Sequence, residues 1–195
     1  MDDVLRALDE IGPGRHEDAI PDWPALNELT AHIVSRHHAY VRDAMPLITA
    51  WLEKLVSRHG AGHPELLEVR TGFAGLADEL SAHMMKEENI LFPYIDTLAA
   101  ARRTGRLPAS PFGTVRNPVR MMEHDHETAG EGLARLRHLT QGYQPPEDAC
   151  TTYRACLQEM ERFEADLHRH VHLENNVLFP RAVALEAELT EGTRD

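Results

Sequence analysis

The stretch HMMKEENILFP at residues 83–93 returns as HVHLENNVLFP at residues 170–180, with identical residues at six of the eleven places. In each copy the first histidine precedes a glutamate by four residues. Residues four apart lie on the same face of a helix, so each copy would present an imidazole beside a carboxylate. The repeat therefore predicts two helices that carry the same pair of polar side chains.

The chain around these copies is patterned for helices. Breakers rich in glycine and proline divide it into long segments at about residues 23–59, 64–103 and 113–140, with a fourth that follows the QGYQPPED stretch and ends near residue 189. Each segment repeats apolar residues at alternating steps of three and four, and strand alternation is absent. We therefore predict an all-α protein, an antiparallel up-down four-helix bundle over residues 25–190. Residues 1–24, with several prolines and glycines, are expected to form a short N-terminal extension.

The buried stripes of these helices contain polar residues. Each stripe includes one histidine, and two stripes also include a glutamate, which gives the set His38, His83, Glu87, His126, His170 and Glu174. The same phase assigns Val34, Ile90 and Val177 to the apolar stripes. Pro93 and Pro180 are expected to kink or end their helices just beyond the repeated motif.

The six polar residues point to a metal centre. One histidine on an apolar face is more often a core residue with a satisfied hydrogen bond, but a buried carboxylate needs a partner, and no Lys or Arg occupies the stripe around Glu87 or Glu174. Imidazole and carboxylate ligands without thiolate favour iron or manganese over zinc. Two histidines for each of two metals, both glutamates shared as bridges, and a bridging oxide or hydroxide would give each metal five ligands and leave one open position per metal. The alternative is a structural bundle without metal.

The spacing also predicts an internal twofold repeat. His83 and His170 are 87 residues apart, and His38 and His126 are 88 apart, as expected for two related helix hairpins. His37 and His124 are likewise 87 apart but lie off the stripes, so we expect them beside the ligands or on the surface.

His59 follows His38 by 21 residues, about 30 Å along an unbroken helix, which is too far to reach the same site.

Composition excludes several classes of protein. The formal charge of −12, without a stripe of Lys or Arg, argues against a nucleic-acid partner. No run of 18 or more apolar residues exists and the N-terminus is acidic, so we expect no membrane association and a cytoplasmic location. Cys150 and Cys156 form no Cys-x-x-Cys pair, so neither a thiolate metal site nor a disulfide framework is indicated.

Four stretches, RHHAYVRDAMPLI, HMMKEENILFP, MEHDHETAGEGL and HLENNVLFPRA, carry a family resemblance. Over about residues 25–187 the chain resembles the hemerythrin-like (HHE) domain, and more narrowly the iron-sulfur cluster repair di-iron proteins. The resemblance implies two non-haem iron ions with an oxide or hydroxide bridge inside the bundle. It implies the same ligands as the stripe pattern, with the two glutamates bridging, and family members also have a histidine that matches His59.

Two departures from the family pattern shape the functional expectation. Residues 1–24 contain no cysteine, whereas full-length members of the repair family begin with a Cys-Cys domain, so the resemblance does not extend to any thiol-dependent part of the repair activity. Gly130 stands four residues after His126, where oxygen-carrying hemerythrins have a further histidine, so a more reactive centre is expected than that of a simple oxygen carrier.

We therefore expect a di-iron protein of nitrosative or oxidative stress. It would bind or reduce nitric oxide, oxygen or peroxide, or donate iron to damaged iron-sulfur proteins. Turnover, as a nitric oxide reductase or a peroxide-consuming enzyme, is left open by the residues. The alternative is a gas or redox sensor, or an iron-binding protein, without catalytic turnover.

Overall fold

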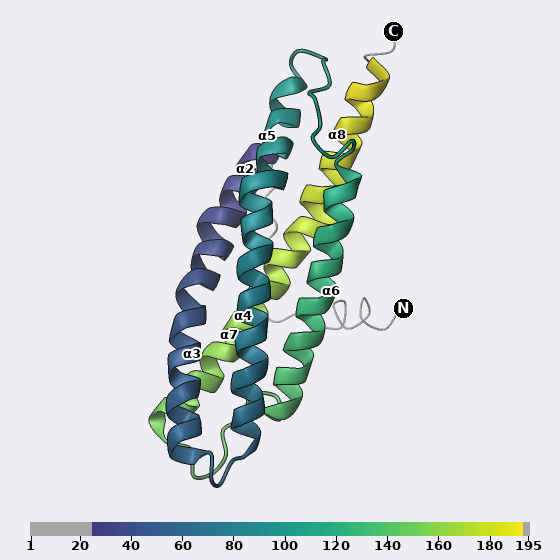
Figure 1. Cartoon of the computed structure of the whole chain (residues 1–195). Coiled ribbons are helices and arrows are strands. Elements are labelled where there is room, and N and C mark those ends of the chain that lie inside the picture. The colour runs from purple at the N-terminus through teal and green to yellow at the C-terminus, as the bar shows by residue number, and fades with distance from the viewer. Residues whose placement is uncertain (1–24, 193–195) are drawn as a thin grey trace.

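The computed structural model describes residues 25–192, which form four long helical runs joined by three loops (Figure 1). The first run consists of α2 (Leu26–His32), η1 (Ile33–His38) and α3 (Ala39–His59), and the second of α4 (Glu65–Lys86), η2 (Glu87–Leu91) and α5 (Phe92–Ala101). The third run is α6 (Arg116–Leu139), and the fourth consists of α7 (Thr151–Leu173), η3 (Glu174–Leu178) and α8 (Phe179–Gly192). The predicted N-terminal extension lies outside the described residues.

Successive runs point in opposite directions along one long bundle (Figure 1). Helix α4 packs against α3 and α6, α3 also packs against α7, and α5 packs against α8 at the other end. The predicted all-α, up-down four-helix bundle is confirmed. Within residues 25–192, no helix is both long and apolar enough to cross a lipid bilayer.

Three of the four runs contain a π-helical segment, which the sequence pattern did not predict. Segments η2 and η3 begin at Glu87 and Glu174, and η1 ends at His38. A π turn inserts one extra residue into an α-helix and is often found at functional sites. The runs do not end at Pro93 or Pro180, because each proline is the second residue of a helix that continues, where its missing N–H is tolerated.

The π turns explain where the predicted apolar stripes were wrong. Ile90 was assigned to the core but is 51% exposed, and the next residue, Leu91, is buried instead. The extra residue rotates the chain beyond it, so the core position shifts by one place. The same shift leaves Val177 half-buried and places Leu178 in the core, and Val34 is half-buried beside a buried Ile33. Helix α6, which has no π turn, keeps its predicted stripe throughout.

Two separate apolar clusters form the core of the bundle. One lies at the end where the 60–64 and 140–150 loops are found and is built by α3, α4, α6 and α7. The other is built mainly by α2, α5, α8 and the first turns of α6. On every run the predicted polar residues lie at or next to the point where the residues of one cluster give way to those of the other. The bundle therefore contains a thin polar layer between two apolar layers.

Candidate metal centre

The polar layer brings together all six residues that the stripe pattern selected. All are buried, none being more than 8% exposed, and each of the four helical runs contributes at least one: His38, His83, Glu87, His126, His170 and Glu174. They form two groups that share both glutamates, and within each group the four candidate ligand atoms lie within 4.8 Å of one another.

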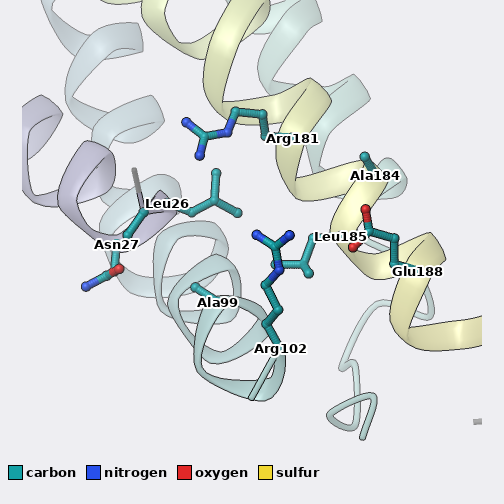
Figure 2. Close-up of a pocket in the computed structure, with 9 residues that line it drawn as sticks. Leu26, Asn27, Ala99, Arg102, Arg181, Ala184, Leu185 and Glu188 are labelled. Carbon is teal, nitrogen blue, oxygen red and sulfur yellow. The ribbon is translucent and has the colours of Figure 1, made fainter. Parts of the chain in front are cut away.

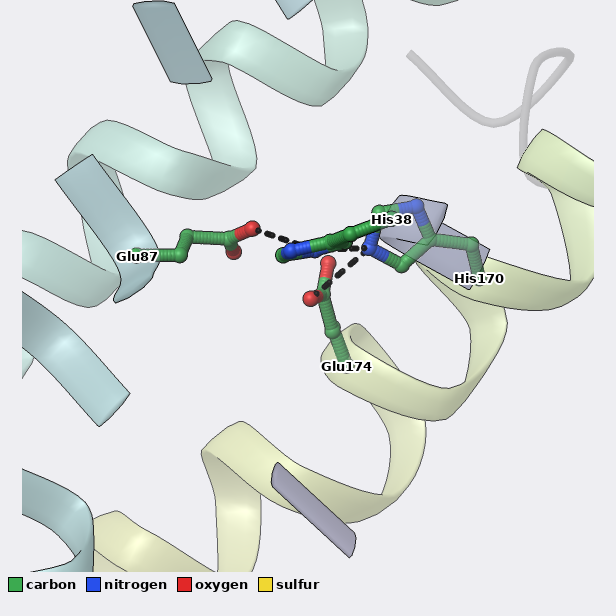
Figure 3. Close-up of side chains that lie close together, drawn as sticks. All are labelled: His38, Glu87, His170 and Glu174. Atoms are coloured by element: carbon green, nitrogen blue, oxygen red, sulfur yellow. Dashed lines mark hydrogen bonds and ion pairs between the residues drawn. The ribbon is translucent and has the colours of Figure 1, made fainter. Parts of the chain in front are cut away.

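The first group, which we call the His38–His170 position, contains those two histidines with Glu87 and Glu174 (Figure 3). The Nε2 atoms of His38 and His170 are 3.1 Å apart. Nε2 of His38 lies 3.3 Å from Oε2 of Glu87, and Nε2 of His170 lies 3.0 Å from Oε1 of Glu174. All four side chains thus point their donor atoms at one small volume.

The second group, the His83–His126 position, repeats this geometry. The Nε2 atoms of its two histidines are 3.1 Å apart. Nε2 of His83 lies 3.2 Å from Oε2 of Glu87, and Nε2 of His126 lies 3.1 Å from Oε2 of Glu174. The two positions are therefore related as the internal repeat of the sequence predicts.

Hydrogen bonding within the chain does not satisfy these groups. Among residues 25–192, no hydrogen bond reaches either carboxylate oxygen of Glu87 or Oε2 of Glu174, although all are buried. Two imidazole nitrogens that face each other at 3.1 Å cannot both carry a proton, so at least one nitrogen of each pair presents a lone electron pair that a cation could accept. Ligand atoms about 2.1 Å from a metal ion and at right angles to each other lie about 3 Å apart. The donor set and its spacing fit a metal ion at each position.

The electrostatics of the cluster also call for positive charge beside the glutamates. Burial alone would raise the pKa of Glu174, but the neighbouring imidazoles of His170 and His126 outweigh it and hold the pKa well below its usual range. Burial alone would lower the pKa of His83, but the charge of Glu87 outweighs it and raises the pKa to about 9. The buried carboxylates thus need positive charge beside them, from imidazole protons or from a bound cation.

A carboxylate outside the cluster contacts Nδ1, the ring nitrogen of His38 that points away from the cluster. Nδ1 of His38 lies 2.6 Å from Oε1 of Glu88, which is also paired with Arg42. Burial would raise the pKa of Glu88, but its hydrogen bonds to His38 and Arg42 lower it below the usual value. An ionised acceptor at Nδ1 fixes the ring and directs the lone pair of Nε2 toward the cluster.

Two other histidines have comparable partners. Nδ1 of His83 lies 3.4 Å from Oδ2 of Asp125, which accepts a hydrogen bond from Lys86 at 2.6 Å. Nδ1 of His126 lies 3.0 Å from Oδ1 of Asn175. Sequence reasoning missed these partners because each acts on a histidine of another helix. Their position in the chain was the available signal, since each directly adjoins one of the six residues.

His37 is buried beside the cluster, which is one of the two locations that the sequence predicted for it. Its Nδ1 lies 3.0 Å from Oδ2 of Asp166, and its ring stacks on that of His170 with a centroid distance of 5.6 Å. The side chain of His124, by contrast, is 76% exposed and lies on the surface.

His59 belongs to neither group. It is the last residue of α3, and its Nε2 lies 3.3 Å from Sγ of Cys150 in the loop before α7. Cys156 is buried in the core, and both cysteines are free. The structure thus places no thiol in the cluster.

A separate cavity of about 280 Å³ lies between α2, α5 and α8. The guanidinium groups of Arg102 and Arg181 extend toward it (Figure 2). None of the six cluster residues lines this cavity, so the candidate centre is independent of it.

The fold and the paired histidine-glutamate groups agree with the comparison to known families. Residues 29–182 match the hemerythrin HHE cation binding domain, and the chain belongs to this family. Among its relatives are proteins named iron-sulfur cluster repair protein YtfE. The protein of that name from Edwardsiella ictaluri (strain 93-146) is 39% identical over 187 residues, which cover 94% of this chain and 76% of the relative. The one from Salmonella newport (strain SL254) is 39% identical over 168 residues, covering 85% of this chain and 70% of the relative.

Proposed function

We propose that the two positions bind one iron ion each, with Glu87 and Glu174 as bridging ligands, and that the protein supports iron-sulfur cluster repair by donating this iron. The observation that carries the proposal is the pair of buried groups, each of two histidines and two glutamates, that share both carboxylates. Such sharing is the arrangement expected for two adjacent cations.

The choice of iron rests on the donor set and on the family. Imidazole and carboxylate donors without thiolate suit a redox-active, first-row metal. When bound, iron would supply a Lewis acid and a redox couple. The role in repair is taken from the names of the relatives. The other open roles, which are nitric oxide, oxygen or peroxide chemistry, rest on the same kind of centre.

The chain itself restricts what can reach the polar layer. The ring of Phe92 stacks on His38 with a centroid distance of 5.8 Å, and the ring of Phe179 stacks on His126 at 6.1 Å. Both phenylalanines are buried and close the layer from the side of α5 and α8. A ligand that enters this centre must therefore be small, such as a diatomic gas or peroxide. A larger partner, such as a damaged iron-sulfur protein, could not enter and would have to take up iron that leaves the centre.

Iron transfer tests the proposal directly. The iron-loaded protein would be mixed, without free iron, with an iron-sulfur protein whose cluster has been damaged by oxidation, and recovery of cluster absorbance would be followed. We expect recovery with the wild-type protein and none with the Glu174→Ala variant, which would be treated with iron in the same way and compared at equal protein concentration. A wild-type protein that keeps its iron and restores no cluster would contradict donation.

The burial of the layer also suits the alternative, a sensor of small molecules without turnover. Exposure of the iron-loaded protein to nitric oxide separates the two. A spectral change without nitrous oxide as product would favour sensing, and nitrous oxide formation would favour reduction.

A further inference from the structure

The four histidines of the cluster differ in what holds their Nδ1 atoms. The internal repeat relates His38 to His126, and these two have matching partners: Glu88 and Asn175 each directly follow a shared glutamate and hold Nδ1 of the histidine on another run. For His38 and His126, the internal repeat therefore includes the contacts of Nδ1 as well as the positions of the rings in the cluster.

The partners of the other two histidines, His83 and His170, do not follow the repeat. His83 is held by Asp125, the residue directly before His126. The repeat partner of Asp125 is His37, which is 88 residues earlier and directly before His38. A histidine thus stands where the repeat would place a carboxylate facing His170.

His37 does not replace the missing acceptor. Its ring lies almost parallel to that of His170, with an interplanar angle of 7°, and its Nδ1 is turned to Asp166. Stacked rings cannot form an in-plane hydrogen bond to Nδ1 of His170. Nothing within residues 25–192 accepts a hydrogen bond from that atom, although His170 is only 1% exposed.

The difference separates the two metal positions. In the His83–His126 position both imidazoles have a partner at Nδ1, whereas in the His38–His170 position only His38 has one. Acceptors at the outer nitrogen orient a ligating histidine and raise its basicity, and loss of one typically costs about 10- to 100-fold in metal affinity. The short contact of Glu88 fixes His38 but not its partner ligand, so release can begin at His170.

We infer that the two metal positions are unequal, and that the His38–His170 position gives up its metal first. The inference rests on the proposed function and deepens it, because it names the position that supplies the donated iron while the other keeps its ion.

Release kinetics test this inference. Wild-type protein loaded with ferrous iron, under anaerobic conditions, would be mixed with excess ferrous chelator, and the coloured complex followed in time. We expect two phases of equal amplitude, one iron per chain in each, with rates that differ about tenfold or more. Two irons that leave at one rate would overturn the inference and leave the proposed function standing, whereas fewer than two bound irons would overturn both.

Variants assign the phases to positions. His170→Ala should keep the slowly released iron, and His126→Ala should keep the rapidly released one. If His126→Ala kept the slowly released iron, the rapidly released iron would belong to the His83–His126 position, and the inference would be overturned.

A milder variant serves if these two fold poorly by circular dichroism. Asn175→Ala removes only the acceptor behind His126, so it should speed the slow phase about tenfold and leave the fast phase unchanged. Acceleration of the fast phase alone would contradict the assignment.

Discussion

At the scale of single residues, the problem is how two glutamate side chains can lie in the middle of a helical bundle. Glu87 and Glu174 are fully buried, and oxygens of both lack hydrogen bonds from the described part of the chain. The sequence identified these residues because their phase was inconsistent with solvent exposure and no basic residue shared their stripe. Their role as metal ligands stays a prediction, and it can be tested one side chain at a time.

The neighbouring histidines His37 and His38 give a matched pair for this test. His38→Ala removes a candidate ligand and Glu87→Ala removes a bridge, so both variants should bind well under two irons per chain. His37→Ala should leave iron content almost intact, because that ring contacts Asp166 and stacks on His170 without facing the cluster. Metal analysis after gel filtration measures all three, and equal loss in the two histidine variants would show that helical phase selected the wrong residue.

At the scale of elements, the π turns mark the limit of what periodicity could predict. The fold class, the four runs and most core positions follow from steps of three and four, and α6 obeys them from end to end. The buried positions differ from the predicted stripes at the π turns, which adjoin the cluster residues. An inserted residue rotates the helix beyond it, so the core position moves by one residue. The outer partners of the histidines were missed for another reason: each links two helices, and phase within one helix carries no information about its neighbour.

Removal of one π turn tests its role. Deleting Ile90, which is exposed, should convert η2 to a regular α-helix and bring the residues from Leu91 onward back into the original phase. We expect the helical content measured by circular dichroism to be kept while bound iron falls, since Glu87 would lose the backbone geometry that directs it into the cluster. Full iron content in the deletion variant would mean that the π turn is not needed for metal binding.

At the scale of the whole molecule, polar contacts at the loop end of the bundle link two loops. Nδ1 of His63 lies 2.9 Å from Oε1 of Glu65, and its Nε2 lies 3.1 Å from Oδ1 of Asp148 in the 140–150 loop. These hydrogen bonds raise the pKa of His63 above its usual value of 6.5, chiefly through Glu65. Because the folded pKa is above the unfolded one, the stabilisation is fully present below about pH 6.5 and is lost as the pH rises through the raised pKa.

The pH dependence of unfolding checks this link. The melting temperature of the wild-type protein should exceed that of His63→Gln by more at about pH 5.5 than at about pH 8.5, because the stabilisation declines as the imidazole loses its proton. His138→Gln, at an exposed histidine, is the control and should change little at either pH. A difference between wild type and His63→Gln that is the same at both pH values would contradict the raised pKa.

The whole bundle is also where the central claim can be measured most directly, through the iron content of the protein expressed with iron supplied, together with its absorption spectrum. We predict two irons per chain with a spectrum characteristic of a non-haem di-iron centre, and loss of both in Glu87→Ala. A wild-type protein with well under two irons per chain, or a variant that binds iron as well as the wild type, would contradict a binuclear centre at His38, His83, Glu87, His126, His170 and Glu174.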